Sequence, residues 1–396
     1  MNEPAADRRM DWVLLAAVGG LIAFSTVLVW SATKSDPQGW IGRQMVAAMI
    51  GLGLMVLVWG ADPRWIRRLA PIGYLLTVAL LLVVLASGSV VNGSQSWLIL
   101  GPMSVQPSEF AKLAVVAMIG LIAAQTTPAA SSWTSTLARH RVPMMLGVAA
   151  VPAALVFAQP DLGTLSILAI VVFATLVVAG AAKKWLFGLA AAAVTAGWLV
   201  VSSGLLAQYQ VDRLLAFLDP SLDPKGAGYN VTQARIAVGN GGLWGQGLFE
   251  GSQTQAGFVP EQHTDFVFTV AAEELGLMGS GLLVLLVGIV VWRALRIARN
   301  SHDLFGRVVG VGIGCWIGVQ AFWNVGMCLG IMPVTGVPLP LVSYGGTAMI
   351  ATLIGIGVLL NIDARASEQI VAPDDVRGHL EPAPAGVRRG VRAAAT

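Results

Sequence analysis

The feature that most constrains this chain is a series of long apolar segments that runs along most of its length. A transmembrane helix needs about 20 consecutive residues that are predominantly apolar, and ten segments reach or approach that length. They are residues 12–30, 41–60, 69–86, 110–124, 142–157, 162–182, 185–206, 266–292, 308–330 and 346–362. The pattern predicts an all-α polytopic membrane protein with ten transmembrane helices and a large extracytoplasmic loop, residues 207–265, between helices 7 and 8.

The amino-acid composition excludes a soluble fold. Charged residues make up 11% of the chain, whereas about 25% is usual for a soluble domain. Hydrophobic residues make up 56% of the 396 residues, more than the interior of a soluble protein can bury, so lipid must solvate most of them. The net charge of +3 is small and gives no indication of nucleic acid binding.

The distribution of positive charge predicts the orientation of the chain. If the N-terminus lies inside and the spans alternate, eighteen of the 24 Lys and Arg residues fall on the inner side. Cytoplasmic loops carry such an excess, so we expect a multi-pass protein of the cytoplasmic membrane with both termini in the cytoplasm. Residues 1–362 are expected to form the membrane domain, and residues 363–396, rich in Ala, Pro and charged side chains, to form a disordered cytoplasmic tail.

The predicted outer loop 207–265 is long enough to suggest a function. Its centre, residues 226–251, contains eight glycines. Glycine lets a backbone approach a phosphate or a sugar closely, and it also makes loops flexible, so both interpretations stay open. A weak helical pattern over residues 229–238 places Arg235 where it could contact anionic head groups at the membrane interface.

Carboxylates follow at the end of this loop. Glu261, His263 and Asp265 lie directly before an apolar helix, at the predicted boundary between water and lipid. Asp265 is a candidate for catalysis, and the alternative is that it caps the helix. Glu273 and Glu274 lie further along the same helix, where carboxylates are costly and suggest either a function or a structural pairing.

The other outer loops carry polar residues as well. Glu109 and Lys112 are three residues apart on one helix, so they can form an ion pair or leave Lys112 to bind an anionic substrate. Gln106 precedes them, and Trp97 is either an interface anchor or a platform for a sugar or lipid. Asp161 follows a proline and is predicted chiefly to cap the next helix.

The last outer loop, residues 333–346, is rich in Pro and Gly and includes Ser343. Non-helical backbone at membrane depth is stable only inside protein or along a wet cavity, which predicts a re-entrant segment here. No metal-ligand spacing, phosphate-binding loop, dinucleotide motif or nucleophilic serine motif occurs in the sequence. The four polar patches therefore predict one outward-facing site between the helices.

These polar runs resemble the motifs of the SEDS family (shape, elongation, division and sporulation proteins). The resemblance extends from about residue 12 to 362. The motifs are NG, WLILG and QPSEFAK within residues 92–112, QPDLGT at 159–164, GNGGLWGQGL at 239–248, PEQHTDF at 260–266 with EELG at 273–276, and PVTGVPLPLVSYGG at 333–346. One residue departs from the pattern, because the family usually has Arg before the tryptophan of the first motif and this chain has Ser96.

The resemblance implies a peptidoglycan glycosyltransferase that polymerises lipid II at the outer face of the cytoplasmic membrane and releases undecaprenyl pyrophosphate. It implies a class B penicillin-binding protein as partner, within the machinery of cell elongation or division. Residues 253–262 are more similar to the RodA branch, which serves elongation, than to the FtsW branch, which serves division. A lipid II flippase, using Lys112, Glu273 and Glu274, and a non-catalytic scaffold for a penicillin-binding protein are the alternatives.

The resemblance also implies roles for individual residues. Asp265 matches the catalytic aspartate and would act as general base or as a ligand of a divalent cation, Mg²⁺ or Mn²⁺. The remaining candidates are Lys112 and Arg235 for the pyrophosphate, Glu109, Trp97 and Gln106 for the donor pocket, and Glu261, His263, Asp161 and Ser343 for supporting contacts.

Overall fold

The computed structural model describes residues 10–34, 38–91, 94–100, 103–125, 132–204, 208–224 and 226–371. Within these ranges, nine helices are long and apolar enough to cross a membrane. They are α1 (Trp12–Ala32), α2 (Trp40–Gly60), α3 (Pro63–Ser87), α4 (Pro107–Gln125), α5 (Ser132–Ala158), α7 (Lys183–Ser202), α11 (Val267–Asn300), α12 (Leu304–Leu329) and α13 (Gly346–Val371). The polytopic helical fold is therefore confirmed.

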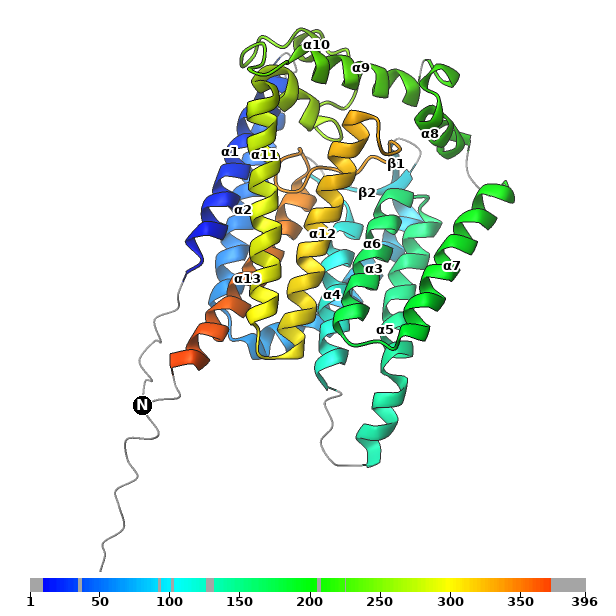
Figure 1. The fold of residues 1–396 in the computed structure, drawn as a ribbon, viewed down its shortest axis with the longest axis vertical. Coiled ribbons are helices and arrows are strands. Elements are labelled where there is room, and N and C mark those ends of the chain that lie inside the picture. Colours follow the sequence, from blue (N-terminus) through cyan, green and yellow to red (C-terminus); the bar gives the residue numbers. More distant parts are fainter. Residues whose placement is uncertain are drawn as a thin grey trace, which may run out of the picture.

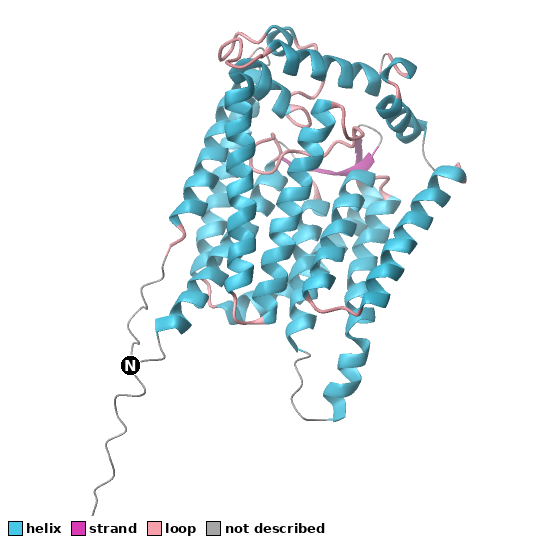
Figure 2. Ribbon diagram, in the orientation of Figure 1, coloured by secondary structure: helices cyan, strands magenta, loops and turns pink. Residues whose placement is uncertain are grey.

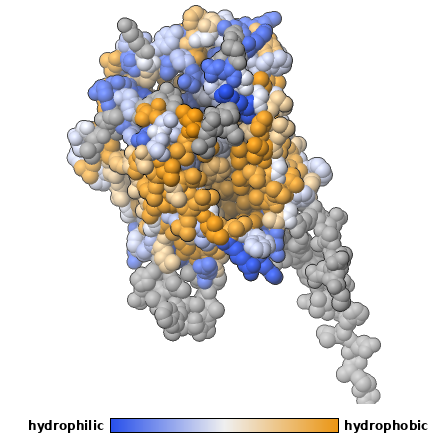
Figure 3. Space-filling view, turned by 180° about the vertical axis from the view of Figure 1, so that it is seen from behind, coloured by the Kyte–Doolittle hydropathy of each residue, from blue (hydrophilic) through white to orange (hydrophobic). Residues whose placement is uncertain are grey.

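The tenth predicted span corresponds to α6 (Leu162–Val178), which is apolar but has only 17 residues. The count of ten spans stays a prediction for this reason. Figure 1 shows the helices side by side as one bundle, and Figure 3 shows, on the face in view, an apolar belt across it with polar side chains gathered toward both ends. A belt of this kind is the surface that lipid tails would cover.

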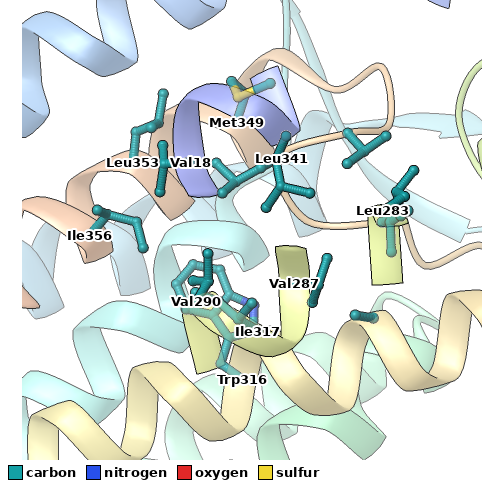
Figure 4. Close-up of a cluster of buried hydrophobic side chains, with 14 of the residues drawn as sticks. Val18, Leu283, Val287, Val290, Trp316, Ile317, Leu341, Met349, Leu353 and Ile356 are labelled. Atoms are coloured by element: carbon teal, nitrogen blue, oxygen red, sulfur yellow. The ribbon is translucent and has the colours of Figure 1, made fainter. Parts of the chain in front are cut away.

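Helix α12 forms the centre of the bundle. It packs against α4, α6, α11 and α13, and Trp316, Ile317, Val290, Leu341 and Ile356 meet in the main cluster of buried apolar side chains (Figure 4). Small residues allow this close packing, as they do in other membrane proteins.

Two features depart from the predicted segments. A small antiparallel sheet, β1 (Ser89–Val91), β2 (Ser94–Leu100) and β3 (Met103–Val105), lies in the loop between α3 and α4, so the fold is not entirely helical. Lipid excludes unpaired backbone but water does not, which is why short strands can form in a loop at the end of the bundle. Helix α13 continues past the predicted end at residue 362 to Val371, and the rest of the predicted tail, residues 372–396, lies outside the described residues.

The long loop between α7 and α11, which the sequence predicts to lie on the outer side, is largely helical. Helices α8 (Gln208–Leu218), α9 (Ala227–Asn240) and α10 (Ser252–Ala256), with a 3₁₀ turn at Pro220–Leu222, form an arch across one end of the bundle (Figures 1 and 2). The weak helical pattern of residues 229–238 falls inside α9.

The glycines between α9 and α10 bring the arch against α11. A Cβ atom at Gly241 would lie 1.8 Å from the carbonyl oxygen of Ala272, and one at Gly245 would lie 2.1 Å from that of Glu274. Gly276 interrupts α11 with a φ of +66°, a conformation that glycine adopts at little cost. These glycines therefore serve contact between two backbones rather than loop flexibility.

Candidate functional site

Asp265 lies in a tight turn where the outer loop enters α11. The carbonyl oxygen of Glu261, which has a φ of +52°, accepts hydrogen bonds from the backbone N–H groups of Thr264, Asp265 and Phe266 at 3.2, 3.0 and 3.2 Å. Helix α11 has Phe266 as its N-cap, and no side chain caps it. Helix capping therefore does not account for Asp265.

The re-entrant segment between α12 and α13 faces this turn. Gly336 has a φ of +75°, and a Cβ atom at this position would lie 3.4 Å from Oδ2 of Asp265. Several side chains of the segment, including those of Val334, Val337 and Leu339, are buried. This irregular segment is therefore buried in protein, and the re-entrant course predicted for residues 333–346 stays a prediction.

The electrostatic surroundings raise the pKa of Asp265 from 3.8 to about 7. Burial is the largest cause, and the negative charges of Glu261 and Asp161 act in the same direction, while Arg213 and a hydrogen bond from Thr264 oppose them. A carboxyl group that titrates near neutral pH can both accept and hold a proton, which is the property of a general base.

The turn before α6 joins three outer elements. Asp161 caps α6, accepting the backbone N–H of Thr164 at 2.9 Å through Oδ1, and its Oδ2 accepts Nε2 of Gln106 at 3.3 Å. The carbonyl oxygen of Pro160 accepts the hydroxyl of Tyr209 at 2.9 Å, which fastens α8 to the turn. The predicted capping role of Asp161 is present, together with its contact to Gln106.

Arg213 is the cation of this region that sequence reasoning missed as a site residue. Its guanidinium group lies 5.5 Å from the centre of the Tyr209 ring, and its charge acts on Asp265. Tyr209 and Arg213 are four residues apart on the amphipathic helix α8, so they share a face. That spacing is the signal that could have singled out Arg213.

Lys112 is buried completely. Its ammonium group donates hydrogen bonds to Oε1 of Glu109 and Oε1 of Gln320, both at 2.7 Å, and it lies 5.0 Å from the centre of the Trp316 ring. Gln320 in turn donates to the carbonyl oxygen of Pro338 at 2.9 Å. The predicted ion pair is therefore present, and a substrate could reach Lys112 only after one of these partners moves.

Trp97 and Arg235 lie away from these contacts. Trp97 is partly buried on β2, in register with Ser89 of β1, and the neighbouring Ser96 is 2% exposed. Arg235 is exposed on α9, and its Cδ atom lies close to Gly330 at the outer end of α12.

Two further candidates support the irregular segments. The hydroxyl of Ser343 accepts the backbone N–H of Leu339 at 2.7 Å. The His263 ring lies 4.9 Å from that of Trp40, and the His263 carbonyl oxygen accepts the backbone N–H of Tyr344 at 2.8 Å. The structure thus places Ser343 and His263 within the framework around Asp265.

Glu273 and Glu274 connect the outer arch to the bundle. The carboxylate of Glu273 accepts the backbone N–H groups of Gln253 at 2.7 Å and Thr254 at 2.9 Å, at the start of α10. The carboxylate of Glu274 accepts the hydroxyl of Ser31 on α1 at 2.6 Å. These bonds correspond to the structural pairing that was the alternative to a functional role.

Asp265 is the residue that would bind a divalent cation in this site. Among the described residues, no three His, Cys, Asp or Glu side chains converge closely enough to hold a metal ion. Mg²⁺ often binds through one or two carboxylates together with phosphate oxygens of the substrate and water. A cation at Asp265 would need ligands of that kind, which a pyrophosphate substrate can supply.

The sequence is similar to known proteins over most of its length. Residues 8–368 match the FtsW, RodA and SpoVE family, described as cell cycle proteins. The chain is 39% identical over 353 residues to peptidoglycan glycosyltransferase MrdB of Escherichia coli (strain K12), which covers 89% of this chain and 93% of that protein. It is 38% identical over 380 residues to a probable peptidoglycan glycosyltransferase FtsW of Halothiobacillus neapolitanus, which covers 91% and 87%.

Solved structures are similar as well. One is a chain of a peptidoglycan synthase complex, from a study of the structural coordination of polymerization and crosslinking. It has a TM-score of 0.73 and is 34% identical in sequence, and the match covers 89% of this chain and 97% of that one. The rod shape determining protein RodA of Thermus thermophilus has a TM-score of 0.65 and 31% identity over 91% and 98%.

Proposed function

Because this chain belongs to the FtsW, RodA and SpoVE family, we propose that it is a peptidoglycan glycosyltransferase that polymerises lipid II into glycan strands. The observation that supports an active site in this chain is the position and the raised pKa of Asp265. Its carboxyl group lies just before the first residue of α11, and its pKa is raised to about 7. A sugar whose lipid tail stays in the bilayer would meet a base at this position.

The reaction needs one proton acceptor. The 4-hydroxyl group of the acceptor's N-acetylglucosamine attacks the anomeric carbon of the donor's N-acetylmuramic acid. The new glycosidic C–O bond forms as the bond to undecaprenyl pyrophosphate breaks, and the deprotonated carboxylate of Asp265 accepts the hydroxyl proton. A bound divalent cation would supply charge neutralisation of the pyrophosphate.

Positively charged side chains serve the leaving group in this proposal. The pyrophosphate already carries its charge, so cations stabilise its departure better than a proton donor does. Arg213 and Arg235 lie on the outer arch. Lys112 would join them after a rearrangement of Glu109 or Gln320.

The remaining candidates shape the pocket. We assign the donor contacts to Glu109, Trp97 and Gln106. We assign the supporting contacts to Glu261, His263, Asp161 and Ser343. The bonds of His263 and Asp161 join separate loops, and those of Glu261 and Ser343 close turns within their own segments.

The biological setting follows from the relatives. We propose a role in cell elongation with a class B penicillin-binding protein as partner, supported by the similarity to rod shape determining protein RodA and to a chain of a peptidoglycan synthase complex. The similarity to FtsW of Halothiobacillus neapolitanus makes a role in division the alternative. The site would face outward from the cytoplasmic membrane, with both termini in the cytoplasm.

Polymerisation of purified lipid II by the purified protein and its Asp265→Asn variant tests the proposal. Asn keeps the size of Asp but cannot accept the proton, and general-base catalysis contributes about 10²–10⁴-fold. We expect the variant to lose at least about a hundredfold in rate while its yield and its binding to a penicillin-binding protein stay unchanged. Asp219→Asn, at an aspartate of the outer arch whose carboxylate accepts bonds from Ser221, is the matched control and should retain the parent rate.

Other outcomes would favour the alternative functions. A pure parent protein that does not polymerise lipid II but supports crosslinking by its partner would indicate a scaffold. Transfer of lipid II across vesicles without polymer would indicate a flippase, although Glu273 and Glu274 already have structural partners in the described part of the chain.

A further inference from the structure

Asn324 on α12 joins the two irregular segments of the site. Its side chain is fully buried. Its Nδ2 group donates one hydrogen bond to the carbonyl oxygen of Asp265 at 2.7 Å and another to the carbonyl oxygen of Val337 at 2.8 Å. One amide group therefore connects the residue that carries the carboxylate with the residue next to Gly336.

Apolar packing and a ring contact join these two segments: Phe266 and Val337 belong to one buried cluster, and the rings of His263 and Tyr344 lie 5.6 Å apart. Neither the turn before α11 nor the segment between α12 and α13 belongs to a regular helix or sheet ladder, so hydrogen bonds to their buried carbonyl groups are needed to fix how the two backbones lie relative to each other. A second link, from the backbone N–H of Tyr344 to the carbonyl oxygen of His263 at 2.8 Å, joins the same segments two residues before Asp265. Asp265 thus takes part in one hydrogen-bonded link through its own carbonyl group and lies two residues after the other, and of these two links only that of Asn324 depends on a side chain.

The neighbouring residue on the same face of α12 acts in a similar way. Gln320, one helical turn before Asn324, donates to the carbonyl oxygen of Pro338 at 2.9 Å and accepts a hydrogen bond from Lys112. Two successive carbonyl groups of the segment, at residues 337 and 338, are therefore bound by two amides of one helix. A rigid helix presenting fixed donors is a suitable support for a site that must hold its geometry.

We propose that Asn324 is a positioning residue of the glycosyltransferase, which holds the Asp265 carboxylate at its place opposite Gly336 by binding the backbone of both segments. This inference rests on the proposed function. Without the amide, the carbonyl group of Val337 loses its donor and that of Asp265 keeps only the long contact from the Cys328 thiol at 4.0 Å, so the turn can shift relative to the segment. We assign Asn324 no contact with substrate, because its side chain is fully buried and its Nδ2 group is bound by two backbone carbonyl groups.

The test is the kinetics of lipid II polymerisation by the full-length protein in detergent or vesicles. Asn324→Leu keeps the approximate shape of the side chain but has no donors. A displacement of about 1 Å at a reacting group can cost about a hundredfold in rate, so we expect kcat to fall by about 10–100-fold. KM for lipid II should stay within about twofold, because the lost contact orients the base and does not bind substrate.

The matched control is Asn361→Leu. Asn361 is also buried, and its Nδ2 group donates to the carbonyl oxygens of Val58, Trp59 and Ala61 at 3.1, 3.0 and 2.8 Å. Asn361 lies near the end of the bundle opposite the arch. The Asn361→Leu substitution therefore removes the same kind of hydrogen bond far from Asp265. We expect a similar loss of thermal stability in the two variants but a fall in kcat only for Asn324→Leu.

A second variant tests the inference if Asn324→Leu does not fold. Asn324→Ser keeps one hydroxyl donor in a smaller side chain, and we expect a folded protein with kcat reduced several-fold and KM unchanged. A folded Asn324 variant with kcat within twofold of the parent would overturn the inference, as would an equal fall in kcat in Asn361→Leu. Inactivity of the parent itself would instead contradict the proposed function, so the two failures are distinguishable.

Discussion

Gly336 lies against the carboxylate of Asp265: a Cβ atom at this position, where φ is +75°, would touch Oδ2 at 3.4 Å, so any larger side chain would reach the carboxylate. The two residues are far apart in the sequence and belong to different outer loops. Their contact defines the wall of the site behind the proposed base.

The first prediction concerns this wall. Gly336→Val should reduce polymerisation by at least about tenfold, because the branched side chain would displace the carboxylate, and a displacement of about 1 Å can cost about a hundredfold. Gly257→Val is the control, since Gly257 has a similar φ of +67° but nothing within 4 Å of an added Cβ atom. Both variants carry similar backbone strain, so equal rates in the two would argue against a role for the wall. The measurement is lipid II turnover at matched protein stability.

The second prediction concerns pH. The pKa of Asp265 is raised from 3.8 to about 7, so the fraction of carboxylate able to accept a proton rises as pH increases through 7. Polymerisation should therefore increase with pH and reach half of its plateau near pH 7. A rate that is flat between pH 5 and 8, measured with saturating lipid II, would contradict general-base catalysis by Asp265.

The raised pKa of Asp265 also affects the stability of the fold. Stability should fall as pH rises, whereas the rate of polymerisation should increase. Between about pH 4 and 7 the folded protein keeps the Asp265 proton while the unfolded chain has lost it, so the folded state binds more protons. The free energy of unfolding should therefore decrease as pH rises through this window. Asp265→Asn removes this contribution, and thermal unfolding of the variant should be less sensitive to pH there than that of the parent.

The third prediction concerns the buried ion pair of Glu109 and Lys112. Lys112→Met or Glu109→Leu alone leaves one uncompensated charge in the bundle, which typically costs about 3–5 kcal/mol. The double variant should recover most of the lost thermal stability. If Lys112 also contacts the pyrophosphate, polymerisation by the stable double variant should stay at least about tenfold low. Recovery of both properties would restrict Lys112 to its structural pair.

The fourth prediction concerns orientation. Cysteine introduced at Ser252, an exposed residue at the start of α10, should react with a membrane-impermeant thiol reagent in cells stripped of outer barriers. Cysteine at Ala385 should react only after the membrane is opened. The two native cysteines lie within α12, where Cys328 is buried, so a variant lacking both is the background. Reversed labelling would place the site on the inner side and contradict the mechanism.

Hydropathy and local sequence determined where the helices lie along the chain and which loops at their ends carry the polar residues of the candidate site. In lipid, α-helices and closed barrels are the structures that satisfy every backbone polar group. Long apolar runs in the sequence therefore located the helical spans, and α1 and α2 begin at or next to their predicted first residues. Asp161 caps α6 as its position before an apolar run predicts. The pairing of Glu109 with Lys112 also follows from their spacing along one helix.

Contacts between distant segments decided the rest. The sequence could not distinguish whether the glycines of the arch cradle a ligand or approach another backbone, and only the packing of Gly241 and Gly245 against α11 answers this. It left Asp265 as either a cap or a catalytic group, a choice that depends on the fold of the turn and on charges from other loops. Asn324 carries no sequence signal at all, because its partners at Asp265 and Val337 are neighbours only after the bundle has formed. Local spacing records what one helix can do, whereas a site built from several loops exists only where tertiary packing brings their backbones together.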